Sequence, residues 1–483
     1  MPSSKEAAQK TLLGFALVMT VIACALPLTP TPPTVEEDTE ILPPTATETL
    51  TLPPFNYDYA RQPTEARGTP PPSSPSCEVR LPSITDLDPY PAPPLQEPAR
   101  GVPFYDPVFG TCIVRVTDRS KDIAADDTSR GLKNEYSRVQ SFNADGSLLV
   151  IRGIDATWYL YDPTTLRPLY KLPIDIEPRW DAKDPNTLYY ISETRLMSFN
   201  ILTGQQTLLH EFASDFPGSN LAAVWTRYEG SPSIDSRYWG LMAQNPQWET
   251  IALLVFDLQE NRVISRLNLP QKPSIDSVTI SPLGNYLLAY YENYCEYGQL
   301  GTLDKPCGLM VYNQALTEAR GMLRIIGHSD TALNRSGKEV LVFQNIDTDH
   351  IAVLDLQSGR VDDLLPIDFS HTALGFHFSG RGFQSPGWAI VSTYNGGHPE
   401  PFTWMDNSVF ALELETAGRI VRLAHTRSIY SENIEKDYWA EPQASASQDM
   451  SRILFTSNWG RSGSEEVETY MIQMPPLWTS LMP

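Results

Sequence analysis

The chain alternates short apolar runs with turns rich in Gly, Asn, Asp, Ser and Pro. The clearest unit lies at 437–474, where a small-residue run at 444–447 and strand-like runs at 452–457 and 468–474 are separated by polar or glycine-containing segments. Short apolar runs bounded by turn residues predict β-strands. The unit therefore predicts strand, short turn, strand, loop and strand, which is most of one blade of a β-propeller.

Six earlier stretches repeat this order. Turns such as Asp145-Gly146 join the first two strands of a stretch, and turns such as Thr203-Gly204 join the last two. The spacing of about 35 to 60 residues suits propeller blades. We therefore predict an all-β, seven-bladed propeller, with an interrupted two-domain sandwich as the alternative. The seven stretches are 138–172, 177–212, 238–269, 273–325, 326–367, 371–424 and 437–474.

The last stretch contains only three strands, so its blade lacks one. The segment 102–118 contains a single strand ahead of the first stretch. We expect this N-terminal strand to pair with the last blade, which would close the ring and remove its free sheet edges.

The N-terminus predicts export and lipidation. Lys5 and Lys10 precede an apolar run from residue 12 to residue 23, which is too short to span a bilayer but suits the core of a signal peptide. The run ends in Val-Ile-Ala-Cys, which resembles the bacterial lipobox. We predict a lipoprotein signal peptide at 1–23 and lipidation of Cys24, with an ordinary secretory signal as the alternative. The predicted location is the cell envelope, on its extracytoplasmic face, with the lipid anchor in the membrane.

The composition changes abruptly after the predicted anchor. Residues 25–76 contain 13 prolines and 10 threonines and have almost no apolar periodicity. Such a segment cannot bury enough apolar surface to offset its ordering entropy. We predict a disordered Pro/Thr-rich stalk at 24–76 and a propeller domain at 77–483.

Charge and motifs exclude several classes of function. The net charge is −22, whereas nucleic-acid binding requires clustered Lys and Arg. No P-loop, His-Glu-x-x-His or serine-hydrolase elbow occurs in the sequence. We expect a monomer that contacts the membrane and a polysaccharide or a cell-envelope protein.

Four cysteines remain besides Cys24, and four cysteines allow three pairings. Cys295 and Cys307 bracket a polar, glycine-containing excursion between two predicted strands, which favours their pairing. Cys77 would then pair with Cys112. Export favours structural disulfides over free thiols, and neither pair has the spacing of a metal site.

Candidate site residues follow from propeller geometry. The innermost strand of each blade begins beside the central channel, so the residues ahead of these strands form one ring. We expect the ligand to be bound by Tyr136, Asp330, His377, Tyr438, Trp439 and Gln443. A mixed nitrogen and oxygen site for Mn, Ca or Zn would use His328, His371 and Glu441. The alternative is structural: His328 would bridge two blades, and His371 or His377 would support a strand.

Two sequence features resemble known propeller families. The Asp-Gly turns and the run R-I-L-F-T-S-N-W-G at 452–460 resemble extracytoplasmic repeats of the TolB type. The last blade and Gly327-His328 resemble oligogalacturonate lyase, a seven-bladed propeller that binds a divalent metal through His and Gln and cleaves uronide chains. A His-Pro-His-Pro run leads that family's last blade, where this chain has Ala-Glu-Pro-Gln at 440–443.

Two functions are consistent with these features. The first is a binding propeller that contacts a glycan or a cell-surface polymer at the channel face. The second, implied by the resemblance, is a metal-assisted polysaccharide lyase. In the lyase, a metal or Arg381 would neutralise a uronate carboxylate, and His328 or His371 would act as the general base. Arg381 lies between glycines, so an ordinary tight turn is its alternative role.

Overall fold

The computed structural model describes residues 77–124, 127–371, 374–395, 403–415, 418–430 and 434–482. These residues belong to one compact unit that spans 57–483. The predicted signal peptide (1–23), Cys24 and the predicted stalk (24–76) lie outside the described residues. No helix in the described ranges is long and apolar enough to cross a membrane.

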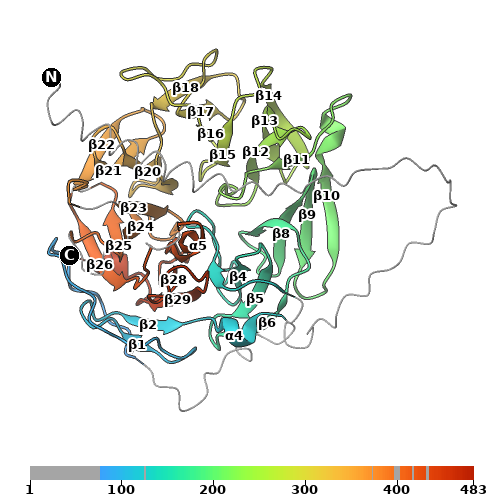
Figure 1. The fold of residues 1–483 in the computed structure, drawn as a ribbon. Coiled ribbons are helices and arrows are strands. Elements are labelled where there is room, and N and C mark those ends of the chain that lie inside the picture. Colours follow the sequence, from blue (N-terminus) through green and yellow to red (C-terminus); the bar gives the residue numbers. More distant parts are fainter. Residues whose placement is uncertain are drawn as a thin grey trace. The chain divides into compact units, whose positions relative to one another are not determined.

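The described residues form seven antiparallel sheets that follow one another in sequence order around a ring (Figure 1). Blade 1 contains β3 (Leu132–Asn134), β4 (Leu149–Gly153), β5 (Trp158–Asp162) and β6 (Arg167–Lys171). Blade 2 contains β7 (Ile176–Trp180), β8 (Thr187–Ser192), β9 (Arg195–Asn200) and β10 (Gln206–Glu211). Blade 3 contains β11 (Ala223–Trp225), β12 (Tyr238–Gln244), β13 (Thr250–Asp257) and β14 (Arg262–Asn268).

Three further blades have the same simple order of strands. Blade 4 contains β15 (Ile275–Ile280), β16 (Tyr286–Tyr291), β17 (Leu309–Asn313) and β18 (Ala319–Leu323). Blade 5 contains β19 (Ser329–Leu333), β20 (Glu339–Asn345), β21 (His350–Asp355) and β22 (Val361–Pro366). Blade 6 contains β23 (Leu374–Ser379), β24 (Trp388–Asn395), β25 (Ser408–Glu413) and β26 (Ile420–His425). These sheets confirm the predicted all-β propeller.

Blade 7 joins the two ends of the propeller. It contains β27 (Ser445–Ala446), β28 (Arg452–Ser457) and β29 (Glu468–Gln473) from the C-terminal region and β2 (Cys112–Arg115) and β1 (Phe104–Tyr105) from the N-terminal region. The β2 strand pairs antiparallel with β29, from Cys112 opposite Gln473 to Arg115 opposite Tyr470. Blue β2 and dark red β29 lie side by side in Figure 1. The predicted closure by an N-terminal strand is therefore confirmed.

Two blades begin earlier than the sequence pattern predicted. The first strand of blade 1 is β3, ahead of the predicted start at residue 138, and the segment after it contributes only an isolated bridge from Phe142 to Leu149. The first strand of blade 3 is β11, ahead of the predicted start at residue 238. Both strands have only three residues, which is too short to show an alternating pattern.

The hydrophobic core lies between neighbouring blades. Side chains of blades 5 and 6 form one buried cluster, and side chains of blades 6 and 7 form another. Val114 of β2 packs with residues of blade 1 and of β28 and β29, so the closing strand belongs to the core. The middle strands are almost fully buried because a blade packs on both of its faces.

The short helices lie in the connections between strands or, for α6, after the last strand. They are α4 (Arg119–Asp122), η1 (Phe212–Asp215), α5 (Ile434–Asp437), η2 (Tyr438–Ala440) and α6 (Trp478–Leu481). The η2 turn matters most for function, because it places two aromatic side chains just ahead of blade 7.

An extended strap, residues 77–100, covers one edge of the propeller. The outer strands of blades 1, 2 and 3 expose several positions, whereas every residue of the outer strand β26 is buried. The Arg422 backbone N–H donates to the Ile84 carbonyl over 2.9 Å, and the Arg422 guanidinium donates to the Asp88 carbonyl over 3.1 Å. The strap therefore protects an edge that would otherwise offer unpaired backbone groups.

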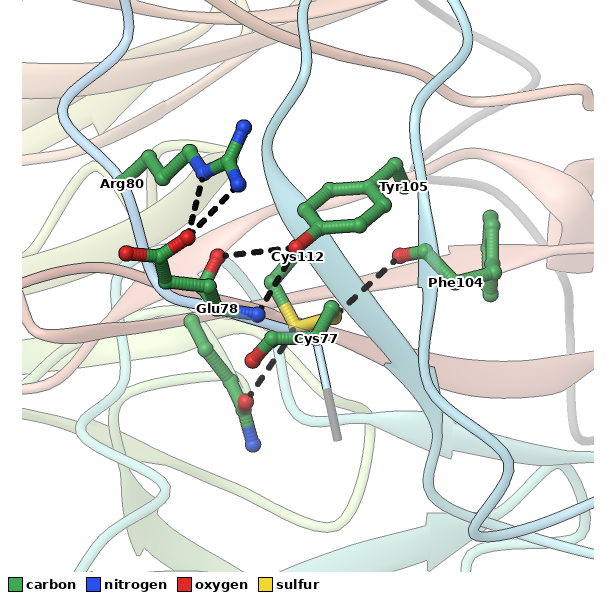
Figure 2. Close-up of a disulfide and its surroundings, with 7 residues drawn as sticks. Cys77, Glu78, Arg80, Phe104, Tyr105 and Cys112 are labelled. Carbon is green, nitrogen blue, oxygen red and sulfur yellow. Dashed lines mark hydrogen bonds and ion pairs between the residues drawn. A yellow bond between two sulfur atoms is a disulfide. The ribbon is translucent and has the colours of Figure 1, made fainter. Parts of the chain in front are cut away.

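Both predicted disulfides are present. Cys295 and Cys307 close the excursion between β16 and β17, with their Cα atoms 5.2 Å apart. Cys77, at the start of the strap, is bonded to Cys112 of β2, and their Cα atoms are 5.7 Å apart. Figure 2 shows this bond with the Glu78 backbone N–H, which donates to the Tyr105 hydroxyl over 2.8 Å. The disulfide ties the strap to the strand that closes the ring.

Candidate functional site at the channel

Side chains from several blades meet in the middle of the ring. The Tyr136 hydroxyl, just beyond β3 of blade 1, lies 3.3 Å from Nδ1 of His328, which immediately precedes β19 of blade 5. The ring centroid of His328 is 4.7 Å from that of His377 on β23 of blade 6. Nε2 of His377 is 2.9 Å from a carboxylate oxygen of Glu441, which leads into blade 7. Non-neighbouring blades can make such contacts only at the central channel.

We call Tyr136, His328, His377, Tyr394 and Glu441 the imidazole cluster. The His377 ring stacks beside Tyr394 of β24 with a centroid separation of 5.7 Å, and its edge meets Tyr136 at 5.5 Å. The side chains of His377 and Glu441 are each 1% exposed. Four of the predicted site residues therefore lie together at the channel: Tyr136, His328, His377 and Glu441.

Burial has the largest effect on the pKa values of His328, His377 and Glu441 in the imidazole cluster. It lowers the pKa of His328 to about 3, and His377 acts in the same direction. Burial also lowers the pKa of His377 well below its usual value, whereas it raises the pKa of Glu441 to about 7. Both imidazoles are therefore neutral near pH 7, and Glu441 titrates near neutrality.

A second group, which we call the ammonium cluster, lies between blades 1 and 7. It consists of Lys133, Glu135, Arg152, Trp439 and Gln443. The Lys133 ammonium donates to Oε1 of Gln443 and lies 5.5 Å from the centre of the Trp439 ring. The Arg152 guanidinium is 5.8 Å from the same ring and 3.7 Å from a Glu135 carboxylate oxygen. Burial lowers the pKa of Lys133 to about 7, and Arg152 acts in the same direction.

The backbone at Gln443 is strained and firmly held. Its φ is +43°, in the left-handed region that non-glycine residues seldom adopt. Asn134 of β3 donates to the Gln443 carbonyl over 2.7 Å, and the Thr456 hydroxyl donates to Asn134 over 2.7 Å. Strained backbone that its surroundings hold in place is typical of functional sites.

A buried ion pair lies beside the imidazole cluster. Arg138 pairs with Glu229 over 2.9 Å, and its guanidinium lies 5.5 Å from the Tyr136 ring centre and 5.0 Å from that of Tyr290. Burial raises the pKa of Glu229 to about 7, although Arg138 opposes this shift. The pair links blade 1 to the segment ahead of β12 in blade 3.

Two predicted catalytic residues have other partners. His371 lies in an exposed turn ahead of β23, where its Nδ1 is 2.5 Å from the Asp368 carboxylate. No described contact joins it to His328 or Glu441. Arg381, which follows β23, binds Asp330 of β19 through two nitrogens over 3.0 and 2.8 Å, and both side chains are 3% exposed. Asp330 is thus engaged by Arg381, and the two join blade 5 to blade 6.

Tyr438 and Trp439 of η2 are half-buried neighbours whose ring centroids are 5.1 Å apart. Sequence reasoning missed Lys133, Arg138, Arg152 and Glu229. The one available signal was the charged Lys133 between Leu132 and Asn134, but its three-residue strand was not recognised.

The described donor atoms do not fit a divalent metal. No group of three or more His, Cys, Asp and Glu side chains in the described ranges is arranged to hold a metal ion. His377 and Glu441 bind each other, His371 is engaged by Asp368, and an ammonium group contacts Gln443. Carboxylate and carbonyl oxygens suit Mn and Ca, but the oxygens of Glu441 and Gln443 that face the cluster already have partners.

A separate cavity of about 310 Å³ lies between the strap and blades 6 and 7. Tyr90, Leu95, Arg427 and Trp459 are among its lining residues. Arg427 donates to the Pro93 carbonyl over 2.8 Å, and Trp459 donates to the Leu95 carbonyl over 3.0 Å. These contacts hold the strap in place, and the cavity contains none of the clustered channel residues.

Comparison with solved structures identifies the fold. An oligogalacturonate lyase in complex with manganese matches with a TM-score of 0.54 and 15% sequence identity, covering 77% of this chain and 96% of that chain. The chain has the fold of an oligogalacturonate-lyase-like seven-bladed propeller. A second oligogalacturonate lyase, from Vibrio parahaemolyticus, matches with a TM-score of 0.53 and 12% identity, over 77% of this chain and 96% of the other. No family model and no curated protein matches the sequence.

Proposed function

We propose that this protein is a membrane-anchored, extracytoplasmic propeller that binds a glycan or a cell-surface polymer at its channel face. The observation that carries the proposal is the ammonium cluster, in which Lys133 and Arg152 lie directly opposite each other on β3 and β4. Like charges in opposed positions destabilise a sheet. Such a pair in the channel is better explained by ligand binding than by stability.

The chemistry around this pair suits a polyhydroxylated ligand. Trp439 offers a half-buried aromatic side chain next to two cations. Oε2 of Glu135 and Nδ1 of His377 are buried and have no hydrogen-bond partner among the described residues. Buried polar atoms normally have partners, so these two atoms favour a ligand that supplies them. Sugars combine apolar ring faces with hydroxyl donors and acceptors.

Replacing Trp439 by alanine is expected to weaken ligand binding by about 1–2 kcal/mol, or roughly 5- to 30-fold, the scale of losing one buried aromatic contact. The full chain would be screened by calorimetry against uronic-acid, neutral glucan and amino-sugar oligosaccharides. Trp248→Ala is the matched control, because Trp248 is 59% exposed on the β12–β13 connection. Equal weakening by both variants, or no binding to any glycan, would contradict the proposal.

A lyase is the second candidate, favoured by the fold and by two buried groups, Lys133 and Glu441, whose pKa values of about 7 suit proton transfer at neutral pH. His328, with a pKa near 3, would be a weak general base at this pH. The same oligosaccharide panel tests this candidate. Formation of an unsaturated, ultraviolet-absorbing product from a uronic-acid oligomer, lost on Glu441→Gln, would establish the enzyme. Binding without product would favour the binding propeller.

The membrane anchor has its own test. Cys24→Ser is expected to abolish metabolic fatty-acid labelling and to release the protein from the membrane fraction, because the acyl chains supply the membrane affinity. Cell fractionation and immunoblotting measure the release. Cys295→Ser is a suitable control, since it removes a cysteine of the folded body. Unchanged membrane partition of Cys24→Ser would contradict the lipoprotein prediction.

A further inference from the structure

Lys133 is a buried cation in the channel with few partners. Lys133 is only 1% exposed, and it lies on the three-residue strand β3. An ammonium group has three N–H donors. Among the described residues, the hydrogen-bond acceptor of Lys133 is Oε1 of Gln443 alone. Two of its three donors therefore have no acceptor among the described residues.

Three groups around Lys133 favour its positive charge, although burial and Arg152 oppose it. The carboxylates of Glu135 and Glu441 both stabilise its charged form, and the Trp439 ring lies 5.5 Å from its nitrogen. Aromatic faces and carboxylates are the groups that hold a desolvated ammonium. The strained Gln443, fixed by Asn134, presents the amide oxygen that binds it. The chain thus has a built cation site and occupies it with its own side chain.

The position of Lys133 explains why the donor atoms of the channel do not fit a divalent metal. Two oxygen-bearing side chains in this region were predicted from the sequence to belong to the site: Glu441 as a metal ligand and Gln443 as a ligand-binding residue. One of them interacts favourably with the Lys133 ammonium, and the other accepts its hydrogen bond. A divalent ion at the same oxygens would meet the Lys133 ammonium at short range, and the repulsion between two cations is strongly unfavourable in a buried site.

We propose that the Lys133 ammonium is the resident cation of this channel in place of a divalent metal, and that it binds an acceptor oxygen of the ligand directly. The first part stands on the geometry of Lys133 alone. The second part rests on the proposed function. Ligand binding is then independent of metal. A ligand must carry an acceptor oxygen, because Lys133 donates a hydrogen bond to it.

Metal content and metal response test the first part. The full chain, purified from medium containing Mn²⁺, Ca²⁺ and Zn²⁺, is expected to carry well below one ion per chain, and added Mn²⁺ should leave its melting temperature unchanged. Lys133→Ala is expected to melt at a lower temperature and to be stabilised by Mn²⁺, because the freed oxygens can then bind the ion. Lys272→Ala, which removes an exposed lysine paired with Glu249, should respond as the unchanged protein does.

Two results would overturn the first part. One is a full equivalent of bound metal in the unchanged protein, or its stabilisation by Mn²⁺. The other is a folded Lys133→Ala variant that Mn²⁺ does not stabilise, because Lys133 would then not occupy a cation site. Lys133→Met, which retains the volume of the side chain, serves as the second variant if the alanine form does not fold. The metal content of the unchanged protein is decisive in either case.

The second part is tested with a uronic-acid oligosaccharide as the probe. Binding by the unchanged protein is expected to be unaffected by EDTA, and Lys133→Met is expected to weaken it by about tenfold or more, the scale of a hydrogen bond to a charged group. Loss of binding in EDTA, or full binding by Lys133→Met, would overturn this part. Absence of binding to every oligosaccharide would instead defeat the proposed function, and the metal result would still decide the role of Lys133 as resident cation.

Discussion

Replacing Glu468 by alanine is expected to lower the free energy of unfolding of the propeller by about 3–5 kcal/mol, the cost of breaking a buried ion pair from one side. Glu468 lies on β29, and its side chain is fully buried. It accepts hydrogen bonds from Arg115 and Arg119, each over 2.7 Å, and from the Thr117 hydroxyl over 2.6 Å. All three donors belong to the N-terminal segment that closes the ring, so the variant removes the buried carboxylate that Arg115 and Arg119 share.

Denaturant unfolding followed by circular dichroism measures this loss. Glu466→Ala is the matched control, because Glu466 also pairs with Arg119, over 2.8 Å, but its side chain is 42% exposed. An exposed pair contributes about 0–1 kcal/mol. Equal effects of the two variants would show that Glu468 does not hold the closure together.

Replacing Arg381 by alanine is also expected to lower the free energy of unfolding by about 3–5 kcal/mol, because it leaves the buried carboxylate of Asp330 unpaired. Arg381 additionally donates to the Thr331 carbonyl over 2.7 Å, and the Gly380 N–H donates to Asp330 over 2.7 Å. The Arg381 guanidinium therefore joins blades 5 and 6 through its hydrogen bonds to Asp330 and Thr331. Any glycan affinity that remains in the folded fraction should be close to that of the unchanged protein.

Thermal unfolding and calorimetry together decide the role of Arg381. Arg262→Ala provides the control, because Arg262 forms an exposed pair with Glu260. A variant of Arg381 that kept full stability and lost glycan binding would support the sequence-based hypothesis of a ligand clamp. Loss of stability with retained affinity would support the structural role.

Most of the propeller could be predicted from local sequence because each blade carries its own turns. Asp145-Gly146 and Thr203-Gly204 lie where tight turns need a residue with positive φ, and Gly146 and Gly204 both have it, at +69° and +71°. One strand within 102–118 was predicted to complete blade 7, since a ring with one three-stranded blade needs another strand. The structure has two strands there, β1 and β2, and β2 is the one that pairs with β29. The three-residue strands β3 and β11 escaped prediction because their position depends on neighbours within the blade.

The candidate site was only partly predictable. His328, His377 and Glu441 lie ahead of or within strands that start at the channel, so the predicted blade order was enough to place them in one ring. His371 also lies ahead of such a strand, but the exposed turn that contains it directs its ring to Asp368. Lys133 owes its importance to Gln443, which is about three hundred residues away in the sequence. Contacts at that separation depend on the closed ring, and local patterns do not encode them.

The Cys77–Cys112 disulfide determines how the propeller would respond to a mechanical pull from its N-terminal side. Tension arriving at Cys77 passes through the covalent bond directly to β2, which is aligned along β29 by four opposed residue pairs. The hydrogen bonds that hold the strap to blade 6 therefore carry none of the load. Reduction of the bond would transfer the tension to the strap, whose contacts would break one at a time before the ring itself was strained. The disulfide thus makes the closing strand, rather than the covering strap, the point at which tension enters the domain.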